Sequence, residues 1–315
     1  MAAPRAKITT DKIFDGLAEK FRRNVYGTAK GWLRQQILYQ DLQQIPFLNQ
    51  QTKPNSAANV LDVGGGLGQM SDWLAQQGHR VHASMRDTSK QTLLVSEAEK
   101  HGVTLTVCEL DVQSQKSVDA CVRDILEEEG RLDVLVNNAG AGFVRTTEQA
   151  AEAEVDWVMD VNFQGVVRCT KAVLPFMREA RSGHIINITS VGGLVGQPFN
   201  EFYCGAKFAV EGYTESLASY VQPAFGIKFS LVEPGGIQSE FANSVLKQLE
   251  STGGIHDDEY RPILESYIGG SRERLASAYQ TSEQVAEVVT QVVASDDPPI
   301  RIRTSEWAEN FCSLK

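Results

Sequence analysis

The sequence predicts an α/β fold, a doubly wound parallel sheet preceded by a helical extension. From residue 59 onward, short apolar runs alternate with longer amphipathic stretches, which is typical of strands alternating with helices. The first apolar run leads into "DVGGGLG", residues 62–68, a glycine-rich strand-to-helix turn of the kind that holds a nucleotide. Hydrophobic residues make up 42% of the chain, which is enough for one large core.

The first part of the chain is predicted to be helical and separate. Residues 11–23 and 29–45 each carry apolar side chains along one helical stripe. The polar, proline-containing stretch 46–59 then indicates a linker. We therefore expect a helical extension over 1–57 and an α/β domain over 58–315. The basic residues that crowd the extension suit either a solvated helix face or a local phosphate-binding face.

The α/β part is predicted to contain strands and helices in alternation. The expected strands are 60–63, 80–84, 104–108, 134–137, 185–189, 228–232 and 300–303. The expected helices begin near Gly68, Lys90, Ser114, Glu152, Glu201 and Ser282. A sheet of this kind binds cofactors at the carboxyl ends of its strands, so the motifs found there decide the functional prediction.

Charge and cysteine content narrow the classes of function. The net charge of -10 argues against a general nucleic-acid or membrane-surface binder. The five cysteines form no CxxC pair and no metal-like spacing, which fits free thiols in a reducing compartment. No apolar run reaches the roughly 20 residues of a membrane span, and the first residues lack a signal-peptide core. We expect a cytoplasmic protein with no metal, membrane or nucleic-acid partner for its main domain.

A tyrosine, a lysine and a serine form the candidate catalytic group. Tyr203 and Lys207 lie four residues apart in "EFYCGAKFAVEG", so one helical face presents both. A free tyrosine has a pKa near 10, and we expect the Lys207 ammonium to lower that pKa by roughly 1 to 3 units. Ser190 follows the predicted strand 185–189 and is suited to hold a carbonyl or alcohol oxygen beside the phenol.

These residues resemble the short-chain dehydrogenase/reductase family, whose signature is a serine followed by Tyr-xxx-Lys. The resemblance covers about residues 78–305 and implies a Rossmann fold and hydride transfer. It makes Tyr203 the general acid/base, Lys207 its pKa-lowering and ribose-binding partner, and Ser190 the group that orients the substrate oxygen. It also makes Asn162, in "MDVNFQG", the fourth catalytic residue, acting through an ordered water. Taken alone, Asn162 also suits an ordinary helix cap.

The same resemblance implies the cofactor contacts. "LDV" at 110–112 matches the adenine-contacting turn, "NNAG" at 137–140 matches the motif beside the ribose, and "EPGGIQS" at 233–239 matches the segment that holds the nicotinamide carboxamide. In the last motif a serine stands where threonine is commoner, and its Pro-Gly pair also suits an ordinary turn. The cofactor-binding residues predicted in this way are Gly64, Gly66, Gly68, Arg86, Asp111, Val112, Asn138, Ala139, Gly140, Tyr203, Lys207, Pro234, Gly235, Ile237 and Ser239.

The second predicted strand indicates which dinucleotide binds. Enzymes that prefer NAD(H) keep an acid at this strand end, where it accepts from the ribose 2′-hydroxyl. Here the strand ends at Arg86, whose guanidinium suits a bidentate contact with the 2′-phosphate of NADP(H). Asp87 follows directly and keeps NAD(H) open. We expect NADP(H).

The stretch 191–218 is similar to the 17β-hydroxysteroid and retinol dehydrogenase branch of the family. This similarity implies a lipophilic secondary alcohol or ketone as substrate. The segment 238–278 carries enough apolar side chains to line a pocket for it, although the same residues suit a packed lid. Helices over 152–180 and 201–223 form the dimer and tetramer faces of this family, so we expect a homo-oligomer.

The glycine loop departs from the family pattern. A glycine belongs at position 62, where the sequence has an aspartate, and the spacing Asp62-x-Gly64-x-Gly66-x-Gly68 resembles motif I of class I S-adenosylmethionine (SAM) methyltransferases. Residues 14–42 are similar to the N-terminal helices of tRNA 5-carboxymethoxyuridine methyltransferases. Residues 1–77 therefore resemble one family and the rest another, as in a chimera. Two alternatives stay open: SAM binding by the front segment, and a folded scaffold without activity.

Overall fold

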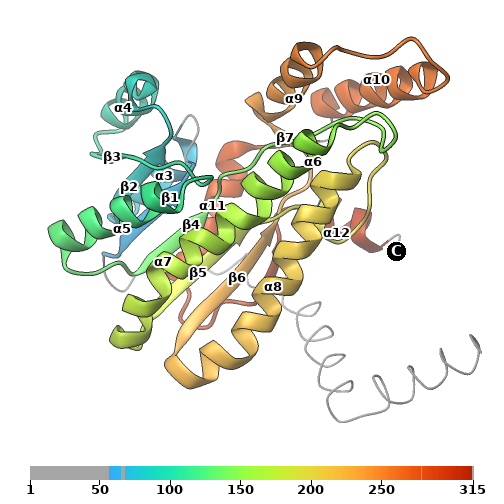
Figure 1. Cartoon of the computed structure of the whole chain (residues 1–315). Coiled ribbons are helices and arrows are strands. Elements are labelled where there is room, and N and C mark those ends of the chain that lie inside the picture. The colour runs from blue at the N-terminus through green and yellow to red at the C-terminus, as the bar shows by residue number, and fades with distance from the viewer. Residues whose placement is uncertain (1–56, 65–67, 278, 314–315) are drawn as a thin grey trace, which may run out of the picture. The chain divides into compact units, whose positions relative to one another are not determined.

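The computed structural model describes residues 57–64, 68–277 and 279–313, all within one compact unit. A parallel sheet of seven strands, ordered β3-β2-β1-β4-β5-β6-β9, forms its centre (Figure 1). The strands are β1 (Asn59–Val63), β2 (Arg80–Met85), β3 (Thr106–Glu109), β4 (Val134–Asn137), β5 (Gly183–Ile188), β6 (Ile227–Glu233) and β9 (Arg301–Arg303). The predicted doubly wound fold is confirmed, and the expected helices in residues 1–56 lie outside the described residues.

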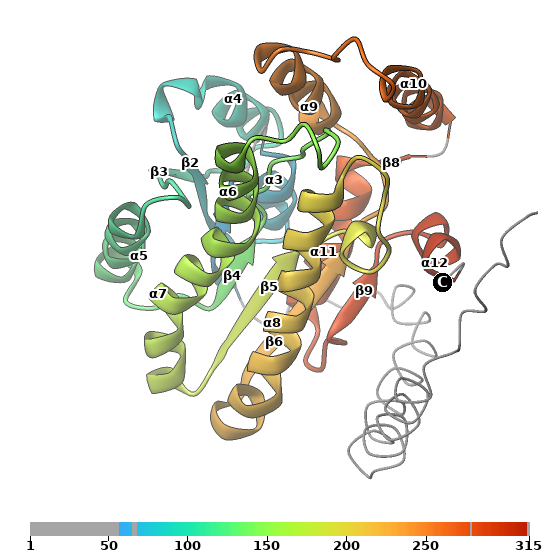
Figure 2. The same ribbon diagram turned by 45° about the vertical axis from the view of Figure 1, so that its right-hand side comes forward.

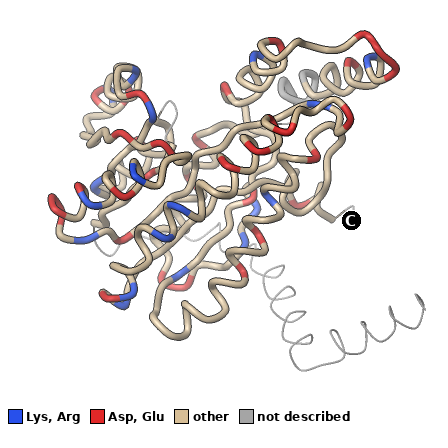
Figure 3. Tube along the Cα trace, viewed as in Figure 1, with Lys and Arg blue, Asp and Glu red and all other residues tan. Residues whose placement is uncertain are grey.

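Helices cover both faces of the sheet. α5 (Gln115–Glu129), α7 (Gly165–Ala180) and α8 (Glu201–Phe225) lie on one face, and α3 (Gln69–Gln76) and α11 (Ser282–Ala294) lie on the other (Figure 1 and Figure 2). Right-handed crossovers between parallel strands produce this arrangement. Along α5, acidic and basic positions are interspersed, as expected for a helix with one solvated side (Figure 3).

The core between the sheet and its helices is apolar. β1 and β4 are buried along their whole length, because helices cover both faces of a parallel sheet. Leu61, Leu135 and Ile185 from the strands pack with Val118 of α5 and Val173 of α7. Apolar burial of this extent is the main favourable contribution to folding.

A chain of buried hydrogen bonds fixes α8 against the sheet. Asn137 Nδ2 donates to Asn187 Oδ1 at 2.8 Å, and Asn187 Nδ2 donates to Thr214 Oγ1 at 2.8 Å. Thr214 Oγ1 donates in turn to the carbonyl of Val210 at 2.7 Å. Because buried hydrogen bonds of this kind specify one arrangement of neighbouring elements, β4, β5 and α8 are held in a fixed register.

The helix expected to begin near Glu152 is interrupted. α6 (Glu152–Met159) runs into a π-helical turn, η4 (Asp160–Gln164), before α7 begins. Asn162 Nδ2 donates to the carbonyl of Val158 at 2.9 Å, the carbonyl that a regular α-helix would pair with the Asn162 N–H. Turns of this kind are frequent at functional sites. The alternative of Asn162 as a simple helix cap was therefore wrong.

Two helices beyond the sheet edge occupy the segment predicted to line a pocket or form a lid. They are α9 (Glu240–Ser251) and α10 (Arg261–Ser277), which lie next to each other in both views (Figure 1 and Figure 2). A short parallel pair, β7 (Ile237–Gln238) and β8 (Gln280–Thr281), joins the two ends of this segment. α12 (Glu306–Ser313) follows β9.

Among the described helices, none combines the length and the apolar character that crossing a bilayer requires.

We expect Gly64→Ala to destabilise the protein strongly. Gly64 has a φ of +81°, and a Cβ built there would lie 2.6 Å from Ala139 Cα. The left-handed backbone alone costs roughly 1–2 kcal/mol, and the clash adds roughly 1–3 kcal/mol. Gly78→Ala is the matched control, since Gly78 has a φ of +87° and nothing within 4 Å. Equal losses in urea unfolding of the two variants would contradict the close contact between Gly64 and Ala139.

Candidate active site

The candidate site lies where the carboxyl ends of β4, β5 and β6 meet the start of α8. Parallel pairing aligns Asn137 of β4 with Asn187 of β5, and Ile188 of β5 with Val232 of β6. The segments that follow these strands therefore leave the sheet at one edge, the edge at which such folds bind ligands. Since α8 begins at Glu201, its first two turns bring the predicted catalytic residues to this edge.

Lys207 is a buried charge of the site, with 4% of its surface exposed. Its Nζ donates to the carbonyl of Ile188 at 3.0 Å and lies 5.7 Å from the centre of the Tyr203 ring. A Cβ built at Gly140 would lie 3.6 Å from the same Nζ and 3.2 Å from Asn162 Oδ1. The exposed backbone of Gly140 thus lies beside both the Lys207 ammonium and the Asn162 amide.

The titration of Tyr203 differs from the sequence-based expectation. Burial raises the pKa of Tyr203 to about 12, and a hydrogen bond with Ser190 is the main opposing effect. The expected lowering of this pKa by Lys207 is therefore wrong for the protein without ligands. Burial also lowers the pKa of Lys207 to about 8, while the charge of Glu211 raises it. The sequence shows the spacing of the two groups, but not how far packing removes both from water.

Ser190 lies two residues after the end of β5, and backbone contacts hold the segment around it. Its Oγ accepts from the N–H of Gly192 at 3.0 Å and caps the short turn η5 (Val191–Gly193). The N–H of Val191 donates to the carbonyl of Pro234 at 2.9 Å. Ser190 is thereby fixed beside both Tyr203 and the segment that follows β6, as the sequence predicts.

Asn162 reaches the site from η4 and is completely buried. Its Oδ1 accepts from the N–H of Ala141 at 3.1 Å, and its Nδ2 donates to the Ala141 carbonyl at 2.8 Å. Asn162 therefore clamps the backbone directly after "NNAG". The four predicted catalytic residues, Asn162, Ser190, Tyr203 and Lys207, lie together around the ends of β4 and β5.

The glycine loop is described at its two ends. Gly64 and Gly68 both have positive φ, whereas Gly66 lies outside the described residues. Asp62 points inward and is completely buried. Its carboxylate accepts from Ser71 Oγ at 2.7 Å and from Asn138 Nδ2 at 3.3 Å. These contacts show that Asp62 supports helix α3 and the "NNAG" segment from within.

The end of β2 presents Arg86 to solvent. Asp87 is engaged locally: its carboxylate accepts from the N–H and the hydroxyl of Ser89 and lies 3.1 Å from Lys90 Nζ. These contacts lower the pKa of Asp87, led by the hydrogen bond from Ser89. Asp87 is therefore engaged by Ser89 and Lys90, whereas Arg86 is exposed to solvent.

The predicted adenine-contacting turn follows β3. Asp111 Oδ1 accepts from the N–H of Gln113 at 3.0 Å, so part of its acceptor capacity stabilises the turn itself. The carbonyl of Val112, which is buried, accepts from Arg168 Nη1 at 3.0 Å. Contacts within the protein thus hold both Asp111 and Val112 in place.

The segment after β6 is packed from below by aromatic rings. A Cβ at Gly235 would lie 2.6 Å from the Trp307 ring, and one at Gly236 would lie 2.3 Å from the Tyr279 ring. Ile237 pairs in β7, and Ser239 Oγ accepts from the N–H of Phe241 at 3.4 Å to cap α9. Pro234, Gly235, Ile237 and Ser239 therefore form one fixed strap beside Ser190.

Helix α9 provides an apolar cover over the phenol. The rings of Phe241 and Tyr203 lie 5.9 Å apart. A Cβ at Gly142 would lie 2.3 Å from Val245 and 2.8 Å from Phe241, so α9 rests directly on the chain beyond β4. The side of the site next to Tyr203 is consequently apolar, which suits a substrate carbonyl carried on a hydrocarbon framework.

Two charged residues near the site were absent from the sequence-based prediction. Glu211 lies one helical turn after Lys207, and this spacing was its only signal in the sequence. Arg301 pairs with Glu211 at 3.1 Å across 90 positions of the chain, and no local pattern announces such a contact.

Comparison with known proteins agrees with this geometry. Residues 57–250 match the family model of short chain dehydrogenases, and the match includes β1 and the glycine loop. The chain is 43% identical over 243 residues to retinol dehydrogenase 8 of Bos taurus, covering 76% of this chain and 77% of that protein. It is 38% identical over 233 residues to human 17-beta-hydroxysteroid dehydrogenase type 1, covering 73% and 70%.

Solved structures give the same fold. A short-chain dehydrogenase from Streptomyces avermitilis superposes with a TM-score of 0.68 at 29% identity, covering 82% of this chain and 92% of that one. A Burkholderia phymatum enzyme in complex with NAD has a TM-score of 0.71 at 22% identity, covering 83% and 93%. With its Ser-Tyr-Lys group at the carboxyl edge of the sheet, the chain belongs to the short-chain dehydrogenase/reductase family and is an NAD(P)-dependent oxidoreductase.

Proposed function

We propose that the protein reduces lipophilic ketones or related carbonyl compounds with NADP(H). The observation that carries this proposal is the half-buried Tyr203 next to the buried Lys207 beside the end of β5, with the ring of Phe241 5.9 Å from the phenol ring. The exposed backbone of Gly140 lies beside Lys207, which supports binding of a dinucleotide there. The test is NADPH consumption with a panel of steroid and retinoid carbonyl compounds.

In this mechanism the bound nicotinamide supplies or accepts the hydride. Ser190 Oγ, fixed by the Gly192 N–H, orients the carbonyl oxygen toward the phenol. Tyr203 donates its hydroxyl proton to that oxygen, and the phenolate that remains is stabilised by the Lys207 ammonium. Asn162 holds the backbone of Ala141 and so keeps the "NNAG" segment beside Lys207.

The phenol carries the proton that carbonyl reduction requires. With a pKa of about 12, Tyr203 carries its proton at neutral pH and is ready to donate it. Oxidation of an alcohol needs the phenolate instead, which is scarce below that pKa. Reduction therefore starts from the protonation state that the free protein favours.

The preference for NADP(H) is supported by Arg86. Its exposed guanidinium stands at the end of β2, where the family contacts the 2′-position of the adenosine ribose. Asp87, the candidate acceptor for NAD(H), is occupied by Ser89 and Lys90. We infer that Arg86 binds the 2′-phosphate and that Asp111 and Val112 hold the adenine.

The substrate class is supported by the relatives and by α9. The relatives named above are dehydrogenases of retinol and of 17β-hydroxysteroids. In this chain Phe241 and Val245 close on Gly142 beside Tyr203 and provide the apolar contacts that such a substrate needs. The proposal is a secondary alcohol or ketone on a rigid, mostly hydrocarbon skeleton.

Further expectations concern parts of the chain beyond this site. We propose a homo-oligomer joined through α7 and α8, because Phe176, Phe208 and Tyr220 on these helices are 40–59% exposed. The methyltransferase-like origin of residues 1–77, with SAM as an alternative ligand, and the cytoplasmic location stay predictions. Calorimetry with S-adenosylhomocysteine and NADPH in parallel separates the two ligands.

Tyr203→Phe is expected to abolish turnover while it preserves cofactor binding. The substitution removes only the hydroxyl that donates the proton, so we expect turnover to fall by roughly 10²- to 10⁴-fold. NADPH binding, followed by fluorescence, is expected to stay within twofold of the unmodified protein. Full turnover by this variant would contradict the assigned role of Tyr203.

Arg86→Gln is expected to weaken NADPH selectively. Loss of a charge-assisted contact worth about 1.5–3 kcal/mol raises the NADPH KM by roughly 10- to 100-fold. The NADH KM is expected to stay unchanged, because NADH lacks the 2′-phosphate. Arg123→Gln on α5 is the control, since that arginine pairs only with surface carboxylates among the contacts of the described residues. Equal effects on both dinucleotides would contradict the assignment.

Asp62→Asn is expected to stabilise the protein above pH 6. Burial raises the pKa of Asp62 to about 6 from 3.8. Between these values the unfolded chain releases its proton while the folded chain keeps it, so stability falls as pH rises, by roughly 3 kcal/mol in total. Asparagine removes this loss and keeps the contacts with Ser71 and Asn138 if the Asn138 amide turns over.

The same variant is expected to bind NADPH more tightly at pH 8. A carboxylate about 5 Å from one phosphate charge repels it by roughly 0.8 kcal/mol in water, or about fourfold in affinity. The gain in affinity and in melting temperature is expected to be much smaller at pH 4, where Asp62 is neutral in the folded protein and only about half ionised in the unfolded chain. The stabilisation by Asp62→Asn is the difference in stability between the variant and the unmodified protein. If this difference were no larger at pH 8 than at pH 4, the role assigned to Asp62 would be contradicted.

A further inference from the structure

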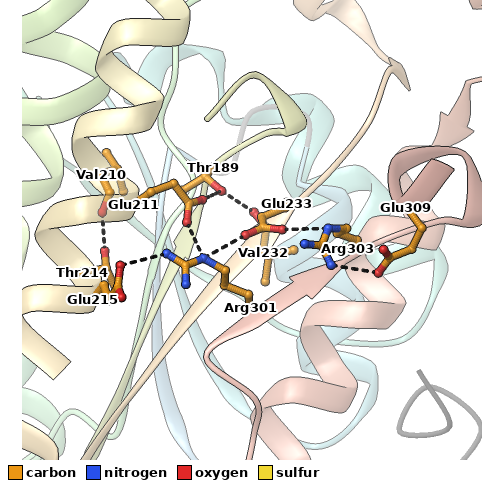
Figure 4. Close-up of polar contacts among 10 residues, drawn as sticks. All are labelled: Thr189, Val210, Glu211, Thr214, Glu215, Val232, Glu233, Arg301, Arg303 and Glu309. Carbon is orange, nitrogen blue, oxygen red and sulfur yellow. Dashed lines mark hydrogen bonds and ion pairs between the residues drawn. The ribbon is translucent and has the colours of Figure 1, made fainter. Parts of the chain in front are cut away.

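Four side chains follow one another at four-residue spacing along α8. They are Tyr203, Lys207, Glu211 and Glu215, and the spacing places them on one side of the helix. The first two belong to the active site. The last two point toward Arg301 of β9 (Figure 4). This row of four side chains therefore runs from the phenol to the ion pairs of Glu211 and Glu215 with Arg301, which take no part in the proposed reaction.

Glu211 is buried, with 4% of its surface exposed, and both its carboxylate oxygens are held. Oε1 accepts from Thr189 Oγ1 at 2.6 Å, and Oε2 accepts from Arg301 Nε at 3.1 Å (Figure 4). These two contacts and the charge of Lys207 favour the ionised carboxylate, whereas burial raises the pKa of Glu211. Glu211 is thus a carboxyl group held in place one turn from Lys207.

Two arginines, Arg301 and Arg303, link the Glu211 carboxylate to three other carboxylates. It pairs with Glu211 at 3.1 Å, with Glu215 at 3.3 Å and with Glu233 at 3.5 Å (Figure 4). Arg303 pairs with Glu233 at 3.5 Å and with Glu309 of α12 at 3.1 Å. When all are ionised, four carboxylates face two guanidinium groups, an excess of two negative charges.

Lys207 supplies the next cation. Burial raises the pKa of Glu233 to about 8, which reduces this excess of negative charge. The ammonium of Lys207 offsets part of the remainder. On the other sides, Lys207 donates to the Ile188 carbonyl of β5 and lies near the ring of Tyr203, and both Lys207 and Asn162 lie close to Gly140. Glu211 is the carboxylate whose charge acts on it.

We propose that Glu211 is a positioning residue of the active site: its carboxylate, fixed by Thr189 and Arg301, keeps the Lys207 ammonium charged and seated beneath Tyr203. This inference deepens the proposed function and rests on it. Packing supports the coupling, because a Cβ at Gly193 would lie 3.2 Å from both Glu211 Cγ and the Lys207 carbonyl. The turn that follows Ser190 is therefore pressed against both residues.

The contact with Thr189 extends the role of Glu211 to the serine. Thr189 directly precedes Ser190, and its hydroxyl also lies 3.2 Å from the carbonyl of Val232. One carboxylate thus ties the strand end that carries the serine to the helix that carries the lysine. Neutralising Glu211 removes the charge that favours the ammonium, while the shape of the site is retained.

The test is a direct titration of Lys207 in the full chain. Proteins labelled with ¹³C at lysine Cε are followed by NMR across pH 6–11, and the Lys207 signal is assigned from a Lys207→Arg sample. We expect Glu211→Gln to lower the pKa of Lys207 by roughly one unit. We also expect the alkaline limb of kcat/KM for NADPH-dependent reduction to move to lower pH by a similar amount.

Glu215→Gln is the matched control. Glu215 pairs with the same Arg301 but lies two turns from Lys207, and its side chain is 36% exposed. We expect this variant to leave the Lys207 titration and the pH profile unchanged. An unmoved Lys207 titration in folded Glu211→Gln, or an equal shift in Glu215→Gln, would overturn the proposal.

Thr189→Val serves if Glu211→Gln does not fold, as judged by its melting curve. It removes the hydrogen bond from Thr189 that favours the ionised Glu211 carboxylate. Unlike Glu211→Gln, it leaves the carboxylate that pairs with Arg301 in place. We expect a shift of the Lys207 titration in the same direction and of smaller size, and no shift would contradict the inference. The NMR titration does not need turnover, so an unmodified protein that consumes no NADPH contradicts the proposed function alone.

Discussion

The burial of one ammonium group is the constraint on which the site depends. Lys207 has almost no contact with water, and its Nζ is held by the carbonyl at the end of β5. A buried cation is costly unless polar partners and opposite charge surround it. The fold meets this need with the Ile188 carbonyl, the ring of Tyr203 and the carboxylate of Glu211. Together these partners place a proton donor at the carboxyl edge of the sheet.

The rest of the fold keeps these partners in register. The hydrogen bonds from Asn137 through Asn187 to Thr214 fix α8 against β4 and β5, two turns beyond the lysine. The ion pairs of Arg301 fix the same helix from β9. Asp62 plays a comparable part on the cofactor side, where it supports α3 and the "NNAG" segment. Its charge is less suited to a pyrophosphate than the glycine usual in this family, so support and cofactor affinity oppose each other at this position.

Sequence patterns predicted the strands and the catalytic group because both depend on local spacing. A run of apolar residues indicates a buried strand without reference to the rest of the fold. Tyr203 and Lys207 share a helix face because they are four residues apart. The contact of Arg301 with Glu211 was not predictable, since tertiary packing alone brings them together. The titration of Tyr203 was predicted with the wrong sign for a similar reason. Its burial beneath Phe241 depends on how α9 folds over the site, and no local pattern encodes that.

In the proposed reaction, a hydride passes to a carbonyl carbon at this edge of the sheet, and Tyr203 donates a proton to the carbonyl oxygen. Transfer of isotope tests it most directly. The full chain is incubated with NADPH that carries deuterium at the reactive C4 position and with a 17-ketosteroid or retinaldehyde, and the product is analysed by mass spectrometry. The account predicts an alcohol with one deuterium on the former carbonyl carbon. Tight binding of NADPH with no labelled alcohol from any lipophilic carbonyl compound would contradict it.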